Sequence, residues 1–542
     1  MSDFAHICDA FYRSWFIFHP ESAVELGVEG FSERLTPYGH DEIAALKVLQ
    51  EKLLFALDEF NPEKLNDELR IDAELMRGQA IVELETLANF DWRYRDPTRF
   101  IPVNAIYQLT LRRVENPKQA LLSRLTAIPA YLRGARAYLT AEPEQIPSLW
   151  LESACTESLH GAAYLRSLRH HPDFQRYRLE QALDAAAHAL EDYAHFLESE
   201  LSKHAIGSFA FGRTHFELLL RYRHHLDIDA DSLYKFGKNL FDQTWRELRD
   251  ITMELRGDDD VHALSKSLQA DHLVLDDLID RYRQTIDAAK TFVEQHQLVS
   301  LPRKEKLTVI ETPEFLRHQI PFAAYHEPAP NDPEQHGYYY VTPPETEDGY
   351  GEHNSISLAH TSVHEAWPGH HLQFVTANLS AASSTVPRLL NPSAMTYEGW
   401  ALYCEALMQE KGFLSSPASR FILLKDRLWR AMRVMLDVEL HCRSLALDDA
   451  IQRMVEQLDF TPAQARADLD WYTRAPTVPM GYATGWALIT ATRTRLEHSE
   501  SAFELKGFHD RLLACGSIAL PEVIRKQFGQ PMWESVRRSV FG

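Results

Sequence analysis

The chain has 542 residues, of which 45% are hydrophobic and 25% charged, so it can bury a large core without disulfide bonds or a structural metal. Its net charge of −22 argues against binding to nucleic acid or to an anionic membrane surface, because both need a basic face. The five cysteines are widely spaced and form no Cys-x-x-Cys pair, which argues against a thiolate zinc site and a disulfide framework.

The N-terminal residues predict neither export nor membrane insertion. They lack the basic start and the uninterrupted apolar run of a signal peptide, and no stretch of about 18 apolar residues occurs in the chain. We therefore expect a cytoplasmic protein that does not cross a membrane.

Helical periodicity dominates the chain. In Glu180–Leu201, apolar residues recur at steps of three and four, with charged residues between them. The same pattern predicts helices at Asp41–Phe60, Asp67–Leu87, Asp231–Leu255 and Arg420–Leu445. These stretches predict a mainly α protein whose apolar stripes pack into a core.

Strand signals are few and lie near the middle of the chain. Leu307–Ile310 and Gly337–Thr342 predict short strands, and the segment between them, rich in proline and histidine, predicts a loop system. We place a domain boundary close to it, between an N-terminal helical lobe of residues 1–300 and a catalytic half of residues 301–542. Tyr340 lies in the second strand, which could form a sheet edge that pairs with an extended peptide.

The segment Ser362–Phe374 (SVHEAWPGHHLQF) carries most of the chemical information, because three histidines and a carboxylate fall within a short stretch. Neutral imidazoles bind zinc, and a nearby carboxylate can serve as the base that metal-activated water requires. In the usual H-E-x-x-H motif, two histidines lie one turn apart on one helix. Here Pro368 stands four residues after His364, so the second ligand must come from further along the chain.

His370 and His371 are the two candidates for that second ligand. In a regular helix His371 shares a face with His364, but it lies about 10 Å further along the axis, which is long for two ligands of one ion. Pro368 and Gly369 are expected to kink the helix. Such a kink could bring either histidine onto the ion.

The segment resembles the signature of the DUF885 family, which is placed among the zincin-like metallopeptidases. Further pieces agree: Glu398–Tyr403 reads EGWALY, an arginine, an aspartate and a histidine follow on one helix, and a late Tyr-x-x-Gly precedes Phe508–Asp510. The resemblance covers nearly the whole chain. It implies a mainly α zincin-like metallopeptidase with two helical lobes around a cleft and a small β element.

The resemblance also implies a set of zinc ligands. It favours His364, His370 and Glu398, the last carried by a neighbouring helix, and leaves His371 and Glu405 as alternates. Histidine and carboxylate ligands suit Zn²⁺, although manganese or cobalt can also bind such a site. Because a core of this size folds without metal, the ion is expected to be catalytic.

Catalytic roles follow from the same resemblance. Glu365 is the expected general base, and Tyr482 is expected to donate its hydroxyl to the oxyanion of the intermediate. Arg433, Asp437 and His441 share a helix face because they are four residues apart. The resemblance implies that this face looks into the cleft. There Asp437 would orient a ligand histidine, while Arg433 would bind a substrate carboxylate and His441 would bind it or act in catalysis.

We therefore expect a zinc-dependent hydrolase that cleaves short peptides with metal-activated water. The apolar segment Val478–Met480 keeps open an amidase or esterase that uses the same site on small molecules. The irregular spacing of the histidine motif also keeps open a non-catalytic helical binding protein with a degenerate metal site. Metal analysis beside a panel of peptide, amide and ester substrates separates these three alternatives.

Overall fold

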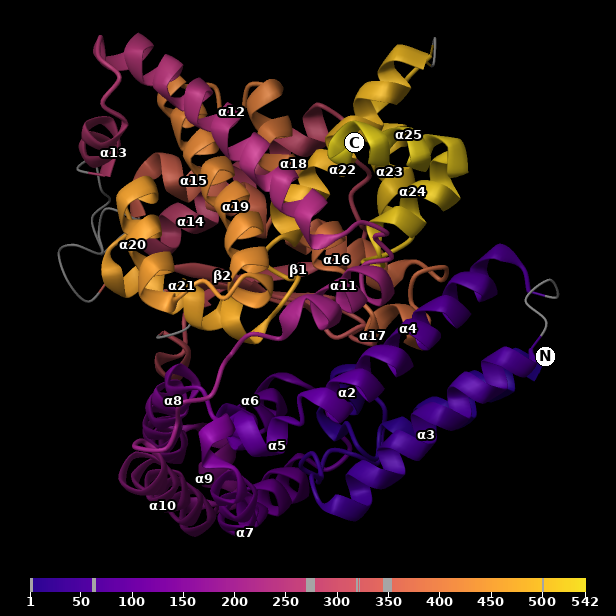
Figure 1. Cartoon of the computed structure of the whole chain (residues 1–542), viewed down its shortest axis with the longest axis vertical. Coiled ribbons are helices and arrows are strands. Elements are labelled where there is room, and N and C mark those ends of the chain that lie inside the picture. The colour runs from indigo at the N-terminus through magenta and orange to yellow at the C-terminus, as the bar shows by residue number, and fades with distance from the viewer. Residues whose placement is uncertain are drawn as a thin grey trace. The chain divides into compact units, whose positions relative to one another are not determined.

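The computed structural model describes residues 3–60, 65–269, 278–317, 320, 322–344, 353–499 and 502–542. It consists of two compact units: Met1–Phe209 with Pro313–Leu316, and Ala210–Thr312 with Arg317–Gly542. The division falls earlier in the chain than the boundary at residues 300/301 that the sequence indicates. The reason is that helix α12 (Ala230–Arg256) packs along α19 (Pro417–Cys442) and so belongs to the second unit (Figure 1).

The first unit is built from helices throughout its described residues. Within it α3 packs against α4, and α10 packs against both α7 and α8. Its helices of four or more residues, including one 3-10 helix and one π-helical turn, are α1 (Asp3–Trp15), α2 (Pro20–Glu25), α3 (His40–Glu59), α4 (Asp67–Asn89), α5 (Trp92–Arg95), η2 (Pro97–Phe100), α6 (Val103–Leu111), α7 (Pro117–Ala141), α8 (Ser148–Ser167), α9 (Pro172–Tyr177), α10 (Glu180–Phe196) and η5 (Leu197–Leu201).

The second unit carries more helices and a small sheet. Besides α12 and α19, its helices are α11 (Gly212–Tyr222), α13 (Val261–Gln269), α14 (Leu278–Gln295), α15 (Ser355–Glu365), α16 (His370–Leu379), α17 (Val386–Leu390), α18 (Ala394–Glu410), α20 (Leu447–Leu458), α21 (Pro462–Arg474), α22 (Gly481–Ser499), α23 (Leu505–Leu513), α24 (Leu520–Phe528) and α25 (Gln530–Phe541).

The sheet has three strands in the order β1–β3–β2. Strand β3 (His336–Val341) pairs in parallel with β1 (Lys306–Glu311) and antiparallel with β2 (Ala323–His326). The expectation that Tyr340 lies on an edge strand is therefore wrong, because both sides of β3 are already paired and Tyr340 is buried. Strand β2 also falls inside the segment for which the sequence predicts a loop.

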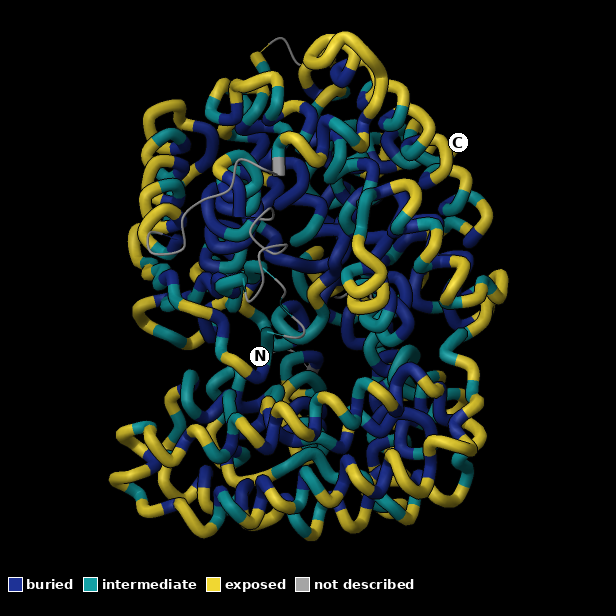
Figure 2. The backbone as a smooth tube through the Cα atoms, turned by 90° about the vertical axis from the view of Figure 1, so that its left-hand side faces the viewer, coloured by how far each residue is buried: buried dark blue, intermediate teal, exposed yellow. Residues whose placement is uncertain are grey.

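Helices α18 and α19 form the centre of the second unit. Every residue of α19 from Ala431 to His441 is buried, and Figure 2 shows the buried positions in dark blue on the inner helices. The start of α15 is set by Asn354, whose side chain accepts hydrogen bonds from the N–H groups of Ile356 and Ser357. The mainly α architecture with a small β element is thus confirmed. None of the described helices is both long and apolar enough to cross a bilayer.

Candidate metal centre

The histidine motif lies on two helices separated by a sharp break. Helix α15 ends at Glu365 and α16 begins at His370, and the peptide between Trp367 and Pro368 is cis. A Cβ on Gly369 would lie 1.8 Å from the carbonyl oxygen of His364, so only glycine fits where the chain turns back. The expected kink is therefore a complete break. His364 and His371 lie on different helices, so they do not share the helix face that a regular helix would give them.

The break brings His364 and His370 together with Glu398 of α18. Glu398 Oε2 lies 3.4 Å from His364 Nε2 and 3.3 Å from His370 Nε2, and the three candidate ligand atoms lie within 4.8 Å of one another. Two ligands of a tetrahedral zinc ion, each about 2.1 Å from it, lie about 3.4 Å apart. The spacing and the donor set of these three residues therefore fit a divalent cation such as zinc.

Two close contacts hold Glu398 in this place. The indole N–H of Trp400 donates to the carbonyl oxygen of Pro368 at 2.8 Å, which ties α18 to the turn between the histidine helices. On the other side α18 touches α22, where a Cβ on Gly399 would lie 2.5 Å from Cα of Gly485. Small residues at both positions let the two backbones meet, so Glu398 is fixed from two directions.

Glu405 stands behind His364 and orients its ring. Glu405 Oε1 lies 2.7 Å from His364 Nδ1, and both side chains are buried. A metal-binding histidine usually donates its other ring N–H to such a carboxylate, which leaves the far nitrogen for the ion. Burial alone would raise the pKa of Glu405, but the nearby imidazoles of His360 and His364 lower it to about 2. Glu405 thus occupies the supporting position rather than that of the alternate third ligand.

The site carries an excess of negative charge. Burial lowers the pKa of His364, yet the carboxylates of Glu398 and Glu405 outweigh burial and raise it to about 10. Glu398 shows the reverse effect, since the two imidazoles lower its pKa despite burial. Such a potential attracts a cation, which can replace the proton on His364.

Glu365 lies at the end of α15, directly after His364, and is half-buried. Burial, with the charge of Glu398, raises the pKa of Glu365, while His364 and His370 act in the opposite direction. A carboxylate with a raised pKa is a stronger base than one in water. The position and the environment of Glu365 therefore suit proton transfer beside the three candidate ligands.

Tyr482, at the start of α22, reaches the same site. Its ring is nearly parallel to that of His364, with 6.3 Å between the centroids. Burial, with the charge of Glu398, raises the pKa of the Tyr482 hydroxyl well above its usual value, so the hydroxyl keeps its proton and can donate it. The guanidinium of Arg433 also packs against the ring of Tyr482, with its central carbon 4.5 Å from the ring centroid.

Arg433, for which substrate binding is expected, is held by protein groups. Its Nε donates to the hydroxyl of Tyr472 at 2.7 Å, and its guanidinium packs over Trp429 with 4.1 Å to the ring centroid. Arg433 itself is buried. These contacts make Arg433 a support for the ring of Tyr482 rather than an open carboxylate binder.

Asp437 and His441 have structural partners as well. The carboxylate of Asp437 accepts hydrogen bonds from the backbone N–H groups of Thr477 and Met480, at 3.1 and 3.2 Å. His441 Nε2 lies 3.1 Å from the carbonyl oxygen of Tyr472. The expectation that Asp437 orients a ligand histidine is therefore corrected, because it holds the loop that leads into α22. His441 likewise ties two helices together.

His371 points into a separate network. Its Nε2 lies 2.7 Å from Glu305 Oε2, and its Nδ1 lies 3.0 Å from the hydroxyl of Tyr325 on β2. The structure thus brings His370, and not His371, to Glu398. Sequence reasoning missed Glu305 and Tyr325, and no local signal identifies them. It also missed His360, one turn before His364, which the spacing on α15 could have indicated.

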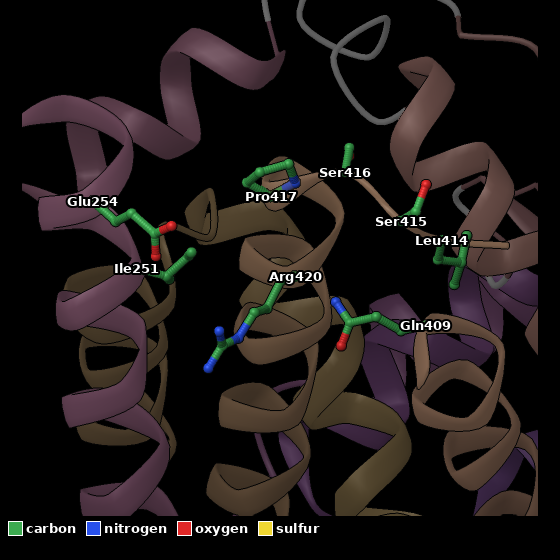
Figure 3. A pocket seen from close by; sticks show the side chains of 8 residues that line it. All are labelled: Ile251, Glu254, Gln409, Leu414, Ser415, Ser416, Pro417 and Arg420. Atoms are coloured by element: carbon green, nitrogen blue, oxygen red, sulfur yellow. The ribbon is translucent and has the colours of Figure 1, made fainter. Parts of the chain in front are cut away.

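A surface cavity of about 310 Å³ lies apart from these residues. It is bounded by the end of α12, the end of α18 and the start of α19 (Figure 3). Its lining residues are Ile251, Glu254, Gln409, Leu414, Ser415, Ser416, Pro417 and Arg420. None of the candidate ligands lines it, so we assign it no part in the chemistry of the metal centre.

Comparison with known proteins places the chain in a wider group. The family described as bacterial protein of unknown function (DUF885) matches residues 20–527. No curated protein matches the chain. A solved structure from Shewanella oneidensis, described as a lipoprotein of unknown function, is 23% identical with a TM-score of 0.79 over 97% of this chain and 100% of that one. Another from Colwellia psychrerythraea, also described as a lipoprotein, is 16% identical with a TM-score of 0.79 over 99% and 98%. These likenesses show a shared fold.

Proposed function

We propose that this chain, which belongs to the DUF885 family of bacterial proteins, is a zinc-dependent hydrolase of the zincin-like type that cleaves short peptides. The observation that carries the proposal is the convergence of His364, His370 and Glu398 at the spacing of zinc ligands. Glu405 behind His364 adds the outer carboxylate that zinc-binding histidines usually have.

Zinc bound by these residues would polarise the scissile carbonyl and make a water molecule more acidic. Glu365 would accept a proton from the attacking water and return it to the leaving amine. The hydroxyl of Tyr482 would donate a hydrogen bond to the carbonyl oxygen as that oxygen becomes negative. Arg433 would keep the ring of Tyr482 in place, since its guanidinium packs against that ring.

The first test is metal analysis of the purified protein and three variants. His370→Ala should lose zinc, while the neighbouring change His371→Ala should keep it, because His371 faces Glu305 instead of Glu398. Glu365→Gln should keep zinc but lose hydrolysis. Equal zinc content in the two histidine variants would overturn the assignment of the ligands.

The second test is a substrate survey. A library of short peptides is assayed beside small amides and esters, with and without a chelator. The proposal expects peptide cleavage that the chelator abolishes and added Zn²⁺ restores. If only non-peptide amides or esters are turned over, the protein is an amidase or esterase that uses the same site, and the peptidase proposal is wrong. If none of the substrates is turned over, with or without the chelator, the result favours a non-catalytic binding protein.

A further inference from the structure

A second cluster of ligating side chains lies beside the metal centre. His360 of α15, Glu405 of α18 and Asp426 of α19 each offer one atom, and these atoms lie within 4.8 Å of one another. His360 stands one turn before His364, and Glu405 stands two turns after Glu398. Helices α15 and α18 therefore contribute one histidine and one glutamate to each of the two clusters. Helix α19 contributes Asp426, the third residue of the second cluster.

Two atoms of this cluster are buried without a hydrogen-bond partner among the described residues: Nδ1 of His360 and Oε2 of Glu405. They lie 3.7 Å apart, and both side chains are only 2% exposed. That distance is too long for a good hydrogen bond. It is close to the separation of about 3.4 Å between two ligands of one tetrahedral ion. Buried polar atoms without partners are costly, so an occupant between them would stabilise the site.

The outer contacts of the cluster match those of a metal site. His360 Nε2 lies 2.9 Å from the hydroxyl of Ser419. If that nitrogen carries the ring proton, Nδ1 presents a lone pair to the cluster. Glu405 uses its Oε1 to orient His364 and turns Oε2 toward His360. His360 and His364 thus each have one ring nitrogen held by a protein oxygen and the other directed at a cluster.

The charges also favour a cation. Glu405 and Asp426 bring two carboxylates together, and Arg430 offsets one of them through a 3.0 Å contact with Asp426 Oδ1. Lys425, which directly precedes Asp426 in the chain, points its ammonium toward Asp459, at 4.0 Å, and also contacts the hydroxyl of Ser265. Glu405 forms its ion pairs with the imidazoles of His364 and His360. When these imidazoles are neutral, as metal binding requires, the two carboxylates carry more negative charge than Arg430 balances.

We propose that His360, Glu405 and Asp426 bind a second divalent cation, with Glu405 shared between the two sites. One imidazole and two carboxylates suit Zn²⁺ or Mn²⁺. The inference goes beyond the proposed hydrolase, because it concerns ion binding and does not require turnover. The other occupant of the space would be a proton shared by His360 and the two acids, and metal counting separates the two cases.

The test counts Zn²⁺ per chain in the full-length protein, after stripping with a chelator, reloading and gel filtration. The wild type should bind two ions. His360→Ala and Asp426→Asn should each bind one, and His364→Ala should also bind one. Asp437→Asn is the matched control on α19, since Asp437 is a buried acid that caps backbone N–H groups outside the cluster, and it should still bind two ions.

The outcomes separate this inference from the proposed function. A wild-type count of one ion, lost in His364→Ala and kept in His360→Ala, overturns the second site and leaves the hydrolase proposal standing. A single ion lost in His360→Ala and kept in His364→Ala supports this site and overturns the zinc centre of the proposed hydrolase. Two ions in both His360→Ala and Asp426→Asn also overturn the inference. The wild-type count does not depend on whether any variant folds.

Discussion

Replacing Gly485 with alanine tests the packing on which the metal centre depends. Helices α18 and α22 touch where a Cβ on Gly485 would lie 1.9 Å from the carbonyl oxygen of Met395 and 2.8 Å from Cα of Gly399. Real Cβ contacts are essentially never shorter than 3.0 Å, so the two backbones must separate by about 1 Å. Glu398 lies on the first of these helices and Tyr482 on the second.

The size of the effect follows from that displacement. Overpacking of this kind usually costs about 1–3 kcal/mol of stability, and more where backbone atoms collide. Metal ligands must hold their geometry to within about 0.5 Å, so a shift of Glu398 by about 1 Å should lower zinc affinity at least about tenfold. Stability and metal affinity should therefore fall together in Gly485→Ala.

The assay combines urea unfolding with zinc titration against a competing chelator. Gly507→Ala is the matched control, because Gly507 also lies in a helix but its Cβ would have no neighbour closer than 3.8 Å. There alanine should raise stability by about 0.5–1 kcal/mol and leave zinc affinity unchanged. If Gly485→Ala keeps both its stability in urea and its zinc affinity, as the control should, the close approach of α18 and α22 does not hold Glu398 in place.

Three further predictions concern Glu405, Asp437 and Trp400. Glu405→Gln should weaken zinc binding about 10–100-fold in a chelator competition, since His364 loses the carboxylate that orients it; unchanged affinity would contradict that role. Burial raises the pKa of Asp437 from 3.8 to about 8, so between these values the folded state holds one more proton than the unfolded state. The free energy of unfolding of the wild-type protein should then fall by about 1.4 kcal/mol per pH unit as pH rises. Comparison of the wild type with Asp437→Asn at pH 5 and 7 should show that this slope is lost in the variant. Trp400→Phe leaves the buried carbonyl of Pro368 with only the weak thiol donor of Cys404 and should cost about 1–3 kcal/mol in urea unfolding, while an unchanged midpoint would show that the indole hydrogen bond contributes nothing.

Helix positions could be read largely from the chain, because the apolar period of a helix is a local property. The helix predicted at Asp231–Leu255 is α12 (Ala230–Arg256), and that at Asp67–Leu87 is α4 (Asp67–Asn89). Strand pairing is different, since it joins segments distant in sequence. The short strand β2 and the central place of β3 therefore escaped prediction, and with them the burial of Tyr340.

The residues of the candidate site divide in the same way. The sequence by itself determined the donor types and the break in the helix, since Pro368 and Gly369 cannot continue a regular turn between His364 and His370. Which histidine faces Glu398 depends on the path of the chain through that break.

Only the tertiary structure decided the partners across helices: Glu405 with His364, Glu305 with His371, and Asp437 with the loop before α22 rather than with a ligand. The reason is physical. Periodicity tells which face of a helix is apolar or charged, but not which other face it meets, and these pairs are separated by 40 residues or more along the chain.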